Sequence, residues 1–206
     1  MPASLTARLA LVTAVPLALA AAGLLVHPHT LKTATAHDWV VLHVWLLPLF
    51  PLLPLGLAVP LHGRLRRDAA GVAAALAWVG GYGYAVLYTG LDAVAGIAGG
   101  TVRVYDAPGQ EALLDHLFAT GGALGRAGVW ALAGAVLATG AALQLHGGAR
   151  DGLRAVPGTA VLLAACWSFR DSHIFWPRGV FTMLAFALGF ALLLWRSPRP
   201  PAQPMT

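Results

Sequence analysis

Six stretches of predominantly apolar residues run along the chain, separated by shorter polar connections. Each stretch is close to the ~20 apolar residues that a helix needs to cross the hydrocarbon core of a bilayer. We therefore predict an all-α fold, a six-helix transmembrane bundle. The predicted helices cover residues 5–26, 38–61, 69–98, 121–145, 153–170 and 178–195. Residues 1–196 then form a single domain, and the proline-rich tail, 197–206, is predicted to be disordered.

The first apolar segment has a second interpretation, as a cleavable signal peptide. Arg8 precedes it, and Ala20 with Ala22 supplies a small-residue cleavage pattern. The apolar run 9–26 is longer than the usual core of about 7–15 residues, which favours a retained helix. Cleavage would leave five helices and the same outer connections.

Basic residues indicate the orientation of the predicted bundle. Cytoplasmic connections of membrane proteins carry an excess of arginine and lysine. The connections after the second and fourth helices, and the tail after the sixth, contain Arg64, Arg66, Arg67, Arg150, Arg154, Arg196 and Arg199. Both termini are therefore predicted to be cytoplasmic. The connections 27–37, 101–119 and 168–179 then face outward.

One face of the third predicted helix carries an unusual set of side chains. Tyr84, Tyr88, Asp92, Gly96 and Gly100 follow one another at four-residue spacing, which places them on one stripe of a helix. An aspartate at the centre of a lipid-facing helix costs on the order of 3 kcal/mol. We therefore expect this stripe to face protein.

The second predicted helix contains three prolines at three-residue spacing, Pro48, Pro51 and Pro54. Each proline removes an amide donor and crowds the preceding turn, so this helix is expected to bend or partly unwind. Broken helices mark binding sites in many transporters. A kinked helix that serves packing alone is the other interpretation, because neighbouring helices satisfy the freed carbonyls.

Composition narrows the class of protein. Of 206 residues, 58% are hydrophobic and only 10% are charged, far from the composition of a soluble domain. The single cysteine, Cys166, excludes an internal disulfide. The net charge of +5 is spread over the ends of apolar segments, so no nucleic-acid surface is predicted. A multi-pass protein of the plasma membrane remains, and twelve arginines against one lysine are typical of GC-rich bacterial coding.

The predicted topology gathers polar side chains in the outer half of the bundle. His43 on the second helix, Asp92 on the third and His173 after the fifth are expected at similar depth. Imidazole and carboxylate together suit a divalent transition metal, with zinc as the first candidate. His37 joins this set if it lies off the helix. A three-ligand set leaves a position open for water.

Other assignments of these residues remain open. Asp92 is alternatively paired with Arg126 at the start of the fourth helix, and haem between His43 and His173 is a less favoured cofactor. Further pocket candidates are Tyr84, Tyr88, Asp171 and Arg178, the last as an anion anchor or an interface residue. We expect the loop histidines His27, His29 and His116 to be solvated.

Three motifs carry a family resemblance: HDWVVLHVWLLPLFPLLPLGL, YTGLDAVAGIAGG and SHIFWPRGVFTM. With them the chain resembles small bacterial polytopic membrane proteins classed as domains of unknown function, a resemblance that implies no activity. More loosely, it is similar to the seven-helix membrane hydrolases that include alkaline ceramidases and the progestin and adipoQ receptors. That similarity implies a zinc ion near His43, Asp92 and His173 and hydrolysis of a lipid or other amphipathic ligand. The chain differs in its six predicted helices and in lacking paired histidines on the last one.

Two functional hypotheses follow. The first is an outer metal site that supports hydrolysis. The second is a non-catalytic membrane protein, either a partner subunit or a small-molecule binder, in which Arg126 neutralises Asp92.

Overall fold

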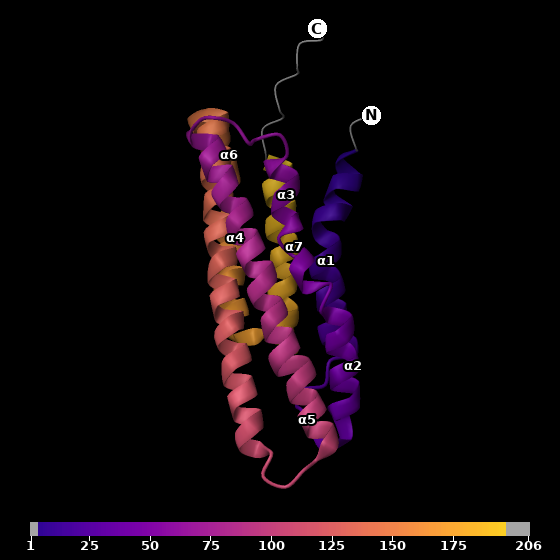
Figure 1. Cartoon of the computed structure of the whole chain (residues 1–206). Coiled ribbons are helices and arrows are strands. Elements are labelled where there is room, and N and C mark those ends of the chain that lie inside the picture. Colours follow the sequence, from indigo (N-terminus) through magenta and orange to yellow (C-terminus); the bar gives the residue numbers. More distant parts are fainter. Residues whose placement is uncertain (1–3, 197–206) are drawn as a thin grey trace.

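The computed structural model describes residues 4–196, and their side chains except at 148–152, 154, 195 and 196. The predicted disordered tail, 197–206, lies outside the described residues. Within 4–196 the chain is helical, with no strand, as predicted. The helices form six rods that run alternately up and down a single bundle (Figure 1).

The first rod is α1 (Leu5–Leu25), whose first turn is capped by Ser4. The Ser4 hydroxyl oxygen accepts a hydrogen bond from the Ala7 amide at 3.2 Å. Near its other end, α1 approaches the last part of the chain through Gly23, where a Cβ would collide with the carbonyl of Ile174. The small residue thus lets the first helix pack tightly against the chain that leads into α7 (Arg178–Arg196).

The second rod is interrupted, as its prolines predict. A short 3₁₀ turn, η1 (Thr33–Thr35), leads into α2 (Ala36–Leu46). A second 3₁₀ turn, η2 (Phe50–Leu52), then separates α2 from α3 (Leu55–Leu61). The missing proline amides explain why the α-helical hydrogen bonds stop here.

The third rod combines α4 (Ala69–Leu91), a π-helical turn η3 (Asp92–Ala98) and α5 (Gly99–Tyr105). Asp68 caps its start, since its carboxylate accepts a hydrogen bond from the Gly71 amide at 2.8 Å. The wider π turn begins at the one acid within this rod. Such π turns occur frequently at functional sites.

The stripe predicted to face protein on this rod is buried at all five positions: Tyr84, Tyr88, Asp92, Gly96 and Gly100. Residues spaced by four drift about 40° per step around an ideal α-helix. A π turn contains more residues and reverses that drift. The local widening at η3 therefore keeps the lower half of the stripe directed into the bundle.

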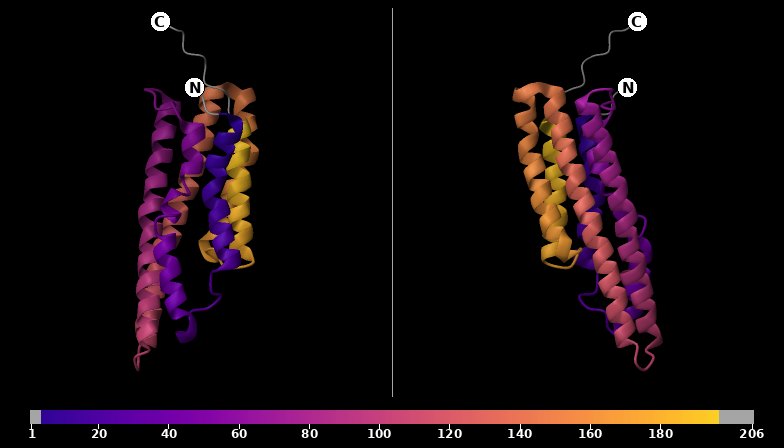
Figure 2. Two further views of the ribbon diagram at one scale, coloured as in Figure 1. Left: turned by 90° about the vertical axis from the view of Figure 1, so that its right-hand side faces the viewer. Right: turned by 60° about the vertical axis from the view of Figure 1, so that its left-hand side comes forward.

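The fourth and fifth rods are the two arms of α6 (Glu111–Ser172), which folds back on itself (Figure 2). The rings of Trp130 and Trp167 lie 6.2 Å apart, and a Cβ on Gly140 would lie 2.8 Å from the Thr159 hydroxyl oxygen. These pairs show that the arms are antiparallel neighbours. They correspond to the fourth and fifth predicted helices.

The hairpin between the third and fourth rods is longer than predicted. Residues 99–105 and 111–120 were expected in a loop, but they extend α5 and α6, and only a short turn joins them. Two hydrogen bonds from Arg103 to Glu111, at 2.7 and 2.9 Å, bridge that turn. Polar residues mark where each apolar segment ends, but the helices continue through them. The hairpin consequently extends well past the α6–α7 turn (Figure 2).

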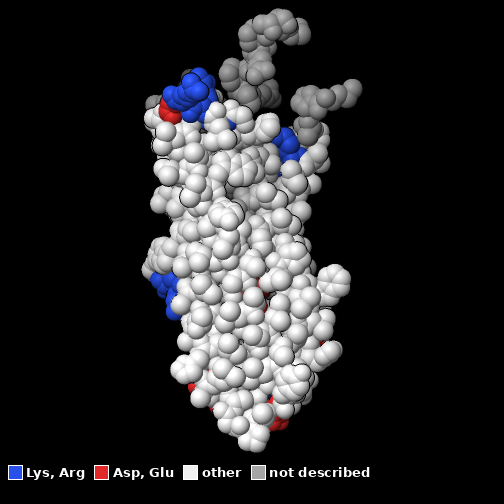
Figure 3. Space-filling view, in the orientation of Figure 1, with Lys and Arg blue, Asp and Glu red and all other residues white. Residues whose placement is uncertain are grey.

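Within residues 4–196, four helical segments are long and apolar enough to cross a membrane: Leu5–Leu25, Thr33–Leu61, Ala69–Tyr105 and Glu111–Gly147. The face seen in Figure 3 is largely uncharged along its length, with most Lys, Arg, Asp and Glu near the two ends. Large apolar side chains such as Leu11, Val72 and Leu137 are more than half exposed. An exterior of this kind suits lipid rather than water.

Candidate metal centre

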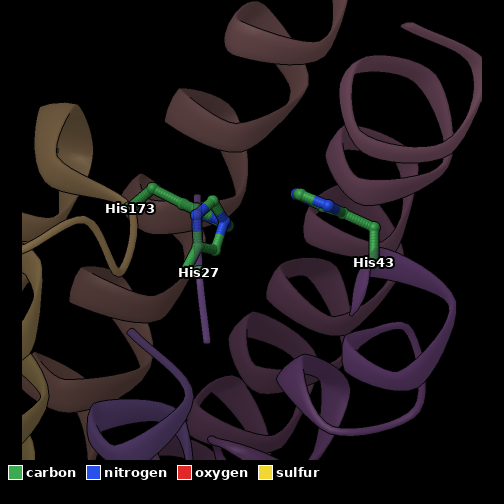
Figure 4. Close-up of side chains that lie close together, drawn as sticks. All are labelled: His27, His43 and His173. Atoms are coloured by element: carbon green, nitrogen blue, oxygen red, sulfur yellow. The ribbon is translucent and has the colours of Figure 1, made fainter. Parts of the chain in front are cut away.

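Three histidines from distant parts of the chain meet in one cluster (Figure 4). His27 lies in the connection after α1, His43 on α2, and His173 in the connection between α6 and α7. One nitrogen from each ring lies within 4.8 Å of the other two. The rings of His43 and His173 are nearly parallel with centroids 6.0 Å apart, and His27 is edge-on to both.

His43 is held in place by its own helix and by the neighbouring rod. Its Nδ1 lies 2.7 Å from the carbonyl oxygen of Trp39, one turn earlier, and the Trp39 indole stacks on it. On the other side, Gly96 of η3 faces the ring so closely that a Cβ there would collide with it. The absence of a side chain at Gly96 therefore makes the space that His43 occupies.

His27 is only 6% exposed, although it lies in a connection. Its Nδ1 lies 2.8 Å from the carbonyl oxygen of Pro28, and the ring packs against Trp39 and Phe175. Burial lowers the pKa of His27 to about 4, with a smaller contribution from the other two histidines nearby, His43 and His29. The ring is therefore neutral at physiological pH, which is the form that binds metal ions.

His173 terminates α6 in an unusual backbone conformation, with φ 44° and ψ −136°. A positive φ at a non-glycine residue is uncommon, and such strain concentrates at functional sites. The Nδ1 of His173 lies 2.8 Å from the Tyr88 hydroxyl of α4, and the Phe50 ring packs against the imidazole. Burial, followed by the nearby His27 and His43, holds the pKa of His173 well below its ordinary value.

The hydrogen bonds of these rings determine which nitrogen is available to a ligand. A carbonyl oxygen only accepts, so Nδ1 of His27 and of His43 must carry the proton and donate it. In the neutral ring, the Nε2 atom then holds a free lone pair. The Nε2 atoms of His27 and His173 are buried and have no hydrogen-bond partner among the described residues. This pattern, with Nδ1 bonded to protein and Nε2 open, is the usual arrangement of a metal-binding histidine.

Asp92, the first residue of the π turn, lies beside this cluster. Its residue exposure is 0%, and neither carboxylate oxygen has a hydrogen-bond partner within the described chain. Its Oδ1 is 4.0 Å from Nε2 of His43. A buried, unpaired carboxylate is costly unless it holds a proton or lies next to a cation. The cluster and Asp92 together thus provide three neutral donors and one acid with no other partner.

The two tyrosines of the stripe lie next to the cluster. Tyr88 contacts His173 through its hydroxyl, and its ring stacks on Tyr84 with centroids 5.1 Å apart. The Tyr84 hydroxyl is buried and without a hydrogen-bond partner in the described part of the chain. Both tyrosines, predicted as pocket residues, therefore line the interior beside the candidate site.

Several other predicted residues lie elsewhere. His37 is exposed on the first turn of α2 and is not part of the cluster. Arg126 is exposed and does not pair with Asp92, so the predicted ion pair is not formed. Asp171 pairs instead with Arg170 at 2.7 Å, and Arg178 donates to the Ser168 carbonyl and hydroxyl oxygens.

Sequence reasoning missed His27, which was expected to be solvated and is buried. No periodic pattern marks it, because it lies in a connection whose path depends on the packing of other rods. His29 and His116 are exposed, as expected, although His116 lies on α6 and not in a loop.

The donor set fits a transition metal ion better than haem. Two nitrogens on a tetrahedral zinc ion lie roughly 3.4 Å apart, given Zn–N bonds of about 2.0–2.1 Å. The observed separations, up to 4.8 Å, are wider, so binding would require the nitrogens to approach one another by up to about 1.4 Å. Haem needs a flat slot between two axial histidines. Here the His27 ring packs edge-on against both His43 and His173.

No family model, curated protein or solved structure matches this chain. The interpretation of the cluster therefore rests on its geometry.

Proposed function

We propose that this protein is an integral membrane protein that binds a divalent transition metal ion, zinc first among the candidates, through His27, His43 and His173. Asp92 faces the fourth coordination position of the ion. It acts there either as the fourth ligand or as the acceptor of a proton from a bound water. The observation that carries the proposal is the convergence of three imidazoles, with His27 and His43 buried and His173 partly buried. The Nε2 atoms of His27 and His173 have no hydrogen-bond partner among the described residues. His37, proposed from the sequence, has no place in this site.

The buried carboxyl group of Asp92 supports the same proposal. A divalent cation within reach of Asp92 would offset the cost of burying its carboxylate. Three neutral imidazoles alone leave a zinc ion with two positive charges in an apolar interior. The acid next to His43 provides the charge that such an ion needs.

Two functions of the ion are compatible with these residues. If Asp92 does not ligate, the fourth position stays open, and zinc can lower the pKa of a bound water to about 7. Asp92 would then accept its proton, and the site would support hydrolysis of a lipid or other amphipathic substrate. If Asp92 ligates, the site is closed and the ion is structural, which is the non-catalytic alternative.

The proposed setting is the plasma membrane, with several spans and both termini cytoplasmic. Arg64, Arg66 and Arg67 lie in the α3–α4 connection, at the end of the bundle where the chain also begins (Figure 1). The histidine cluster lies toward the opposite side, near the α6–α7 turn. In the proposed orientation the ion would lie close to the outer membrane surface.

Metal titration of the purified protein tests this proposal. The protein would be purified in mild detergent, stripped with a chelator and titrated with Zn²⁺ and with Co²⁺, followed by elemental analysis. We expect one ion per chain, and a cobalt spectrum typical of tetrahedral coordination. His27→Ala, His43→Ala and His173→Ala should each abolish stoichiometric binding, because each removes one of three ligands.

His29→Ala is the matched control, since this exposed histidine lies two residues from His27. It should leave binding unchanged. Wild-type protein that takes up no ion on titration, or binding that survives His173→Ala, would refute the site. Asp92→Asn separates the two functions: an altered cobalt spectrum indicates a ligand, and an unchanged spectrum with full binding indicates a residue that acts on bound water.

A further inference from the structure

A second feature of the molecule lies on the side of the bundle, between the two arms of α6. A groove of about 240 Å³ runs there, with a floor formed by Val129, Ala133 and Cys166. Trp130 and Trp167 form its walls and are 55% and 60% exposed. The groove is apolar except at one end, where Arg170 closes it.

The closed end of the groove is strongly basic. The Arg170 guanidinium lies 4.3 Å from the centre of the Trp167 ring, which fixes it over the groove. Arg126 precedes Trp130 by about one turn on the facing arm, so both arginines lie toward the same end of the antiparallel arms. Arg178 reaches the same region through its hydrogen bonds to Ser168.

One acid lies among these three cations. Asp171 is exposed and accepts hydrogen bonds from Arg170 at 2.7 and 3.0 Å. That hydrogen bond holds the pKa of Asp171 below its ordinary value, and the charges of Arg178 and Arg126 act in the same direction. Three guanidiniums thus lie in the region of a single carboxylate, which leaves an excess of positive charge. Figure 3 shows a compact basic patch on this flank, with mainly uncharged surface around it.

We propose that this groove binds an anionic phospholipid, with one acyl chain between Trp130 and Trp167 and the phosphate at Arg126, Arg170 and Arg178. The groove is smaller than the ~300 Å³ at which pockets for compact drug-sized ligands begin, so it suits a length of hydrocarbon chain. Its basic end lies by the α6–α7 turn, at the depth where tryptophan and arginine meet lipid headgroups. Basic pockets between membrane helices are known to bind anionic lipid headgroups.

Quenching of tryptophan fluorescence by brominated lipids tests the proposal on the full-length protein in detergent. Phosphatidylglycerol with brominated chains should quench at a concentration lower by on the order of tenfold than brominated phosphatidylcholine, which has no net charge. The double substitution Trp130→Phe/Trp167→Phe should remove most of the high-affinity quenching, because both indoles line the groove. Arg126→Gln/Arg170→Gln should reduce the preference for phosphatidylglycerol to near unity, and Arg66→Gln, at the opposite end of the bundle, should leave it unchanged.

Helical content and elution volume of each variant establish that it is folded, independently of any metal ion. Inorganic phosphate is then added as a competitor. Phosphate at millimolar concentration should not displace the lipid, because it lacks a chain for the groove. Equal quenching by the two lipids, a preference that survives the double substitution in folded protein, or full displacement by phosphate would each overturn the proposal.

Discussion

At the scale of single residues, Gly96 shows how the absence of a side chain creates a site. It lies in the π turn directly against the His43 ring, and this contact fixes how far His43 reaches into the bundle. The same approach brings Asp92 to 4.0 Å from His43. The position of one ligand thus depends on a residue that makes no polar contact.

Gly96→Ala should displace the His43 imidazole and weaken metal binding. Changes to the supports of metal-bound histidines typically cost 10- to 100-fold in affinity, and we expect a loss on the order of tenfold or more. Competition with a fluorescent zinc chelator measures it. Gly134→Ala is the control, because a Cβ there meets nothing within 4 Å. An unchanged affinity in Gly96→Ala would show that His43 is not a ligand.

The candidate site was predictable from the sequence to the extent that helical geometry determines it. Asp92 and Tyr88 belong to one helical stripe, so their common burial follows from spacing alone. His43 and His173 were expected at similar depth from the order of the apolar segments. His27 could not be placed, because burial in a connection depends on how separate rods pack, and no local pattern records that.

At the scale of elements, the proline-interrupted second rod places a large aromatic ring under the cluster. Phe50, in the 3₁₀ turn between α2 and α3, is 0% exposed. Its ring lies 4.8 Å from that of Tyr88 and 5.0 Å from that of His173. Three prolines predicted the interruption, but not that the break would turn Phe50 toward a histidine.

Phe50→Ala should leave a cavity beneath His173 and Tyr88. Truncation of a fully buried phenylalanine costs on the order of 3 kcal/mol, and we expect a corresponding loss of thermal stability in detergent. Weaker zinc binding should accompany it, because His173 loses its support. Leu52→Ala, in the same turn but 42% exposed, should change both quantities little. Equal effects of the two substitutions would contradict this role for Phe50.

At the scale of the whole molecule, the rods differ in length. α1 and α7 have 21 and 19 residues, close to the ~30 Å of a bilayer core. The hairpin formed by α4, α5 and the first arm of α6 has helical segments of 37 residues, roughly 55 Å long. If the short rods define the membrane, this hairpin projects beyond its outer surface and the histidine cluster lies near its base.

Cysteine labelling in intact cells tests this arrangement. Ala107→Cys, at the tip of the hairpin, should react with a membrane-impermeant maleimide from outside. Leu65→Cys, 65% exposed in the α3–α4 connection, should react only after the membrane is opened. The native Cys166 is 2% exposed and should contribute little signal. The reverse pattern would invert the topology, and labelling of both positions from outside would exclude a spanning arrangement.

The meeting of His27, His43 and His173 also affects the stability of the folded protein. An ion held by His27, His43 and His173 would cross-link these three positions, and so close a short loop between His27 and His43 and a much longer one between His43 and His173. Unfolding would then release the ion, and mass action would couple the folded fraction to the free ion concentration. Scarcity of metal outside the cell would therefore shorten the survival of the protein as well as empty its site.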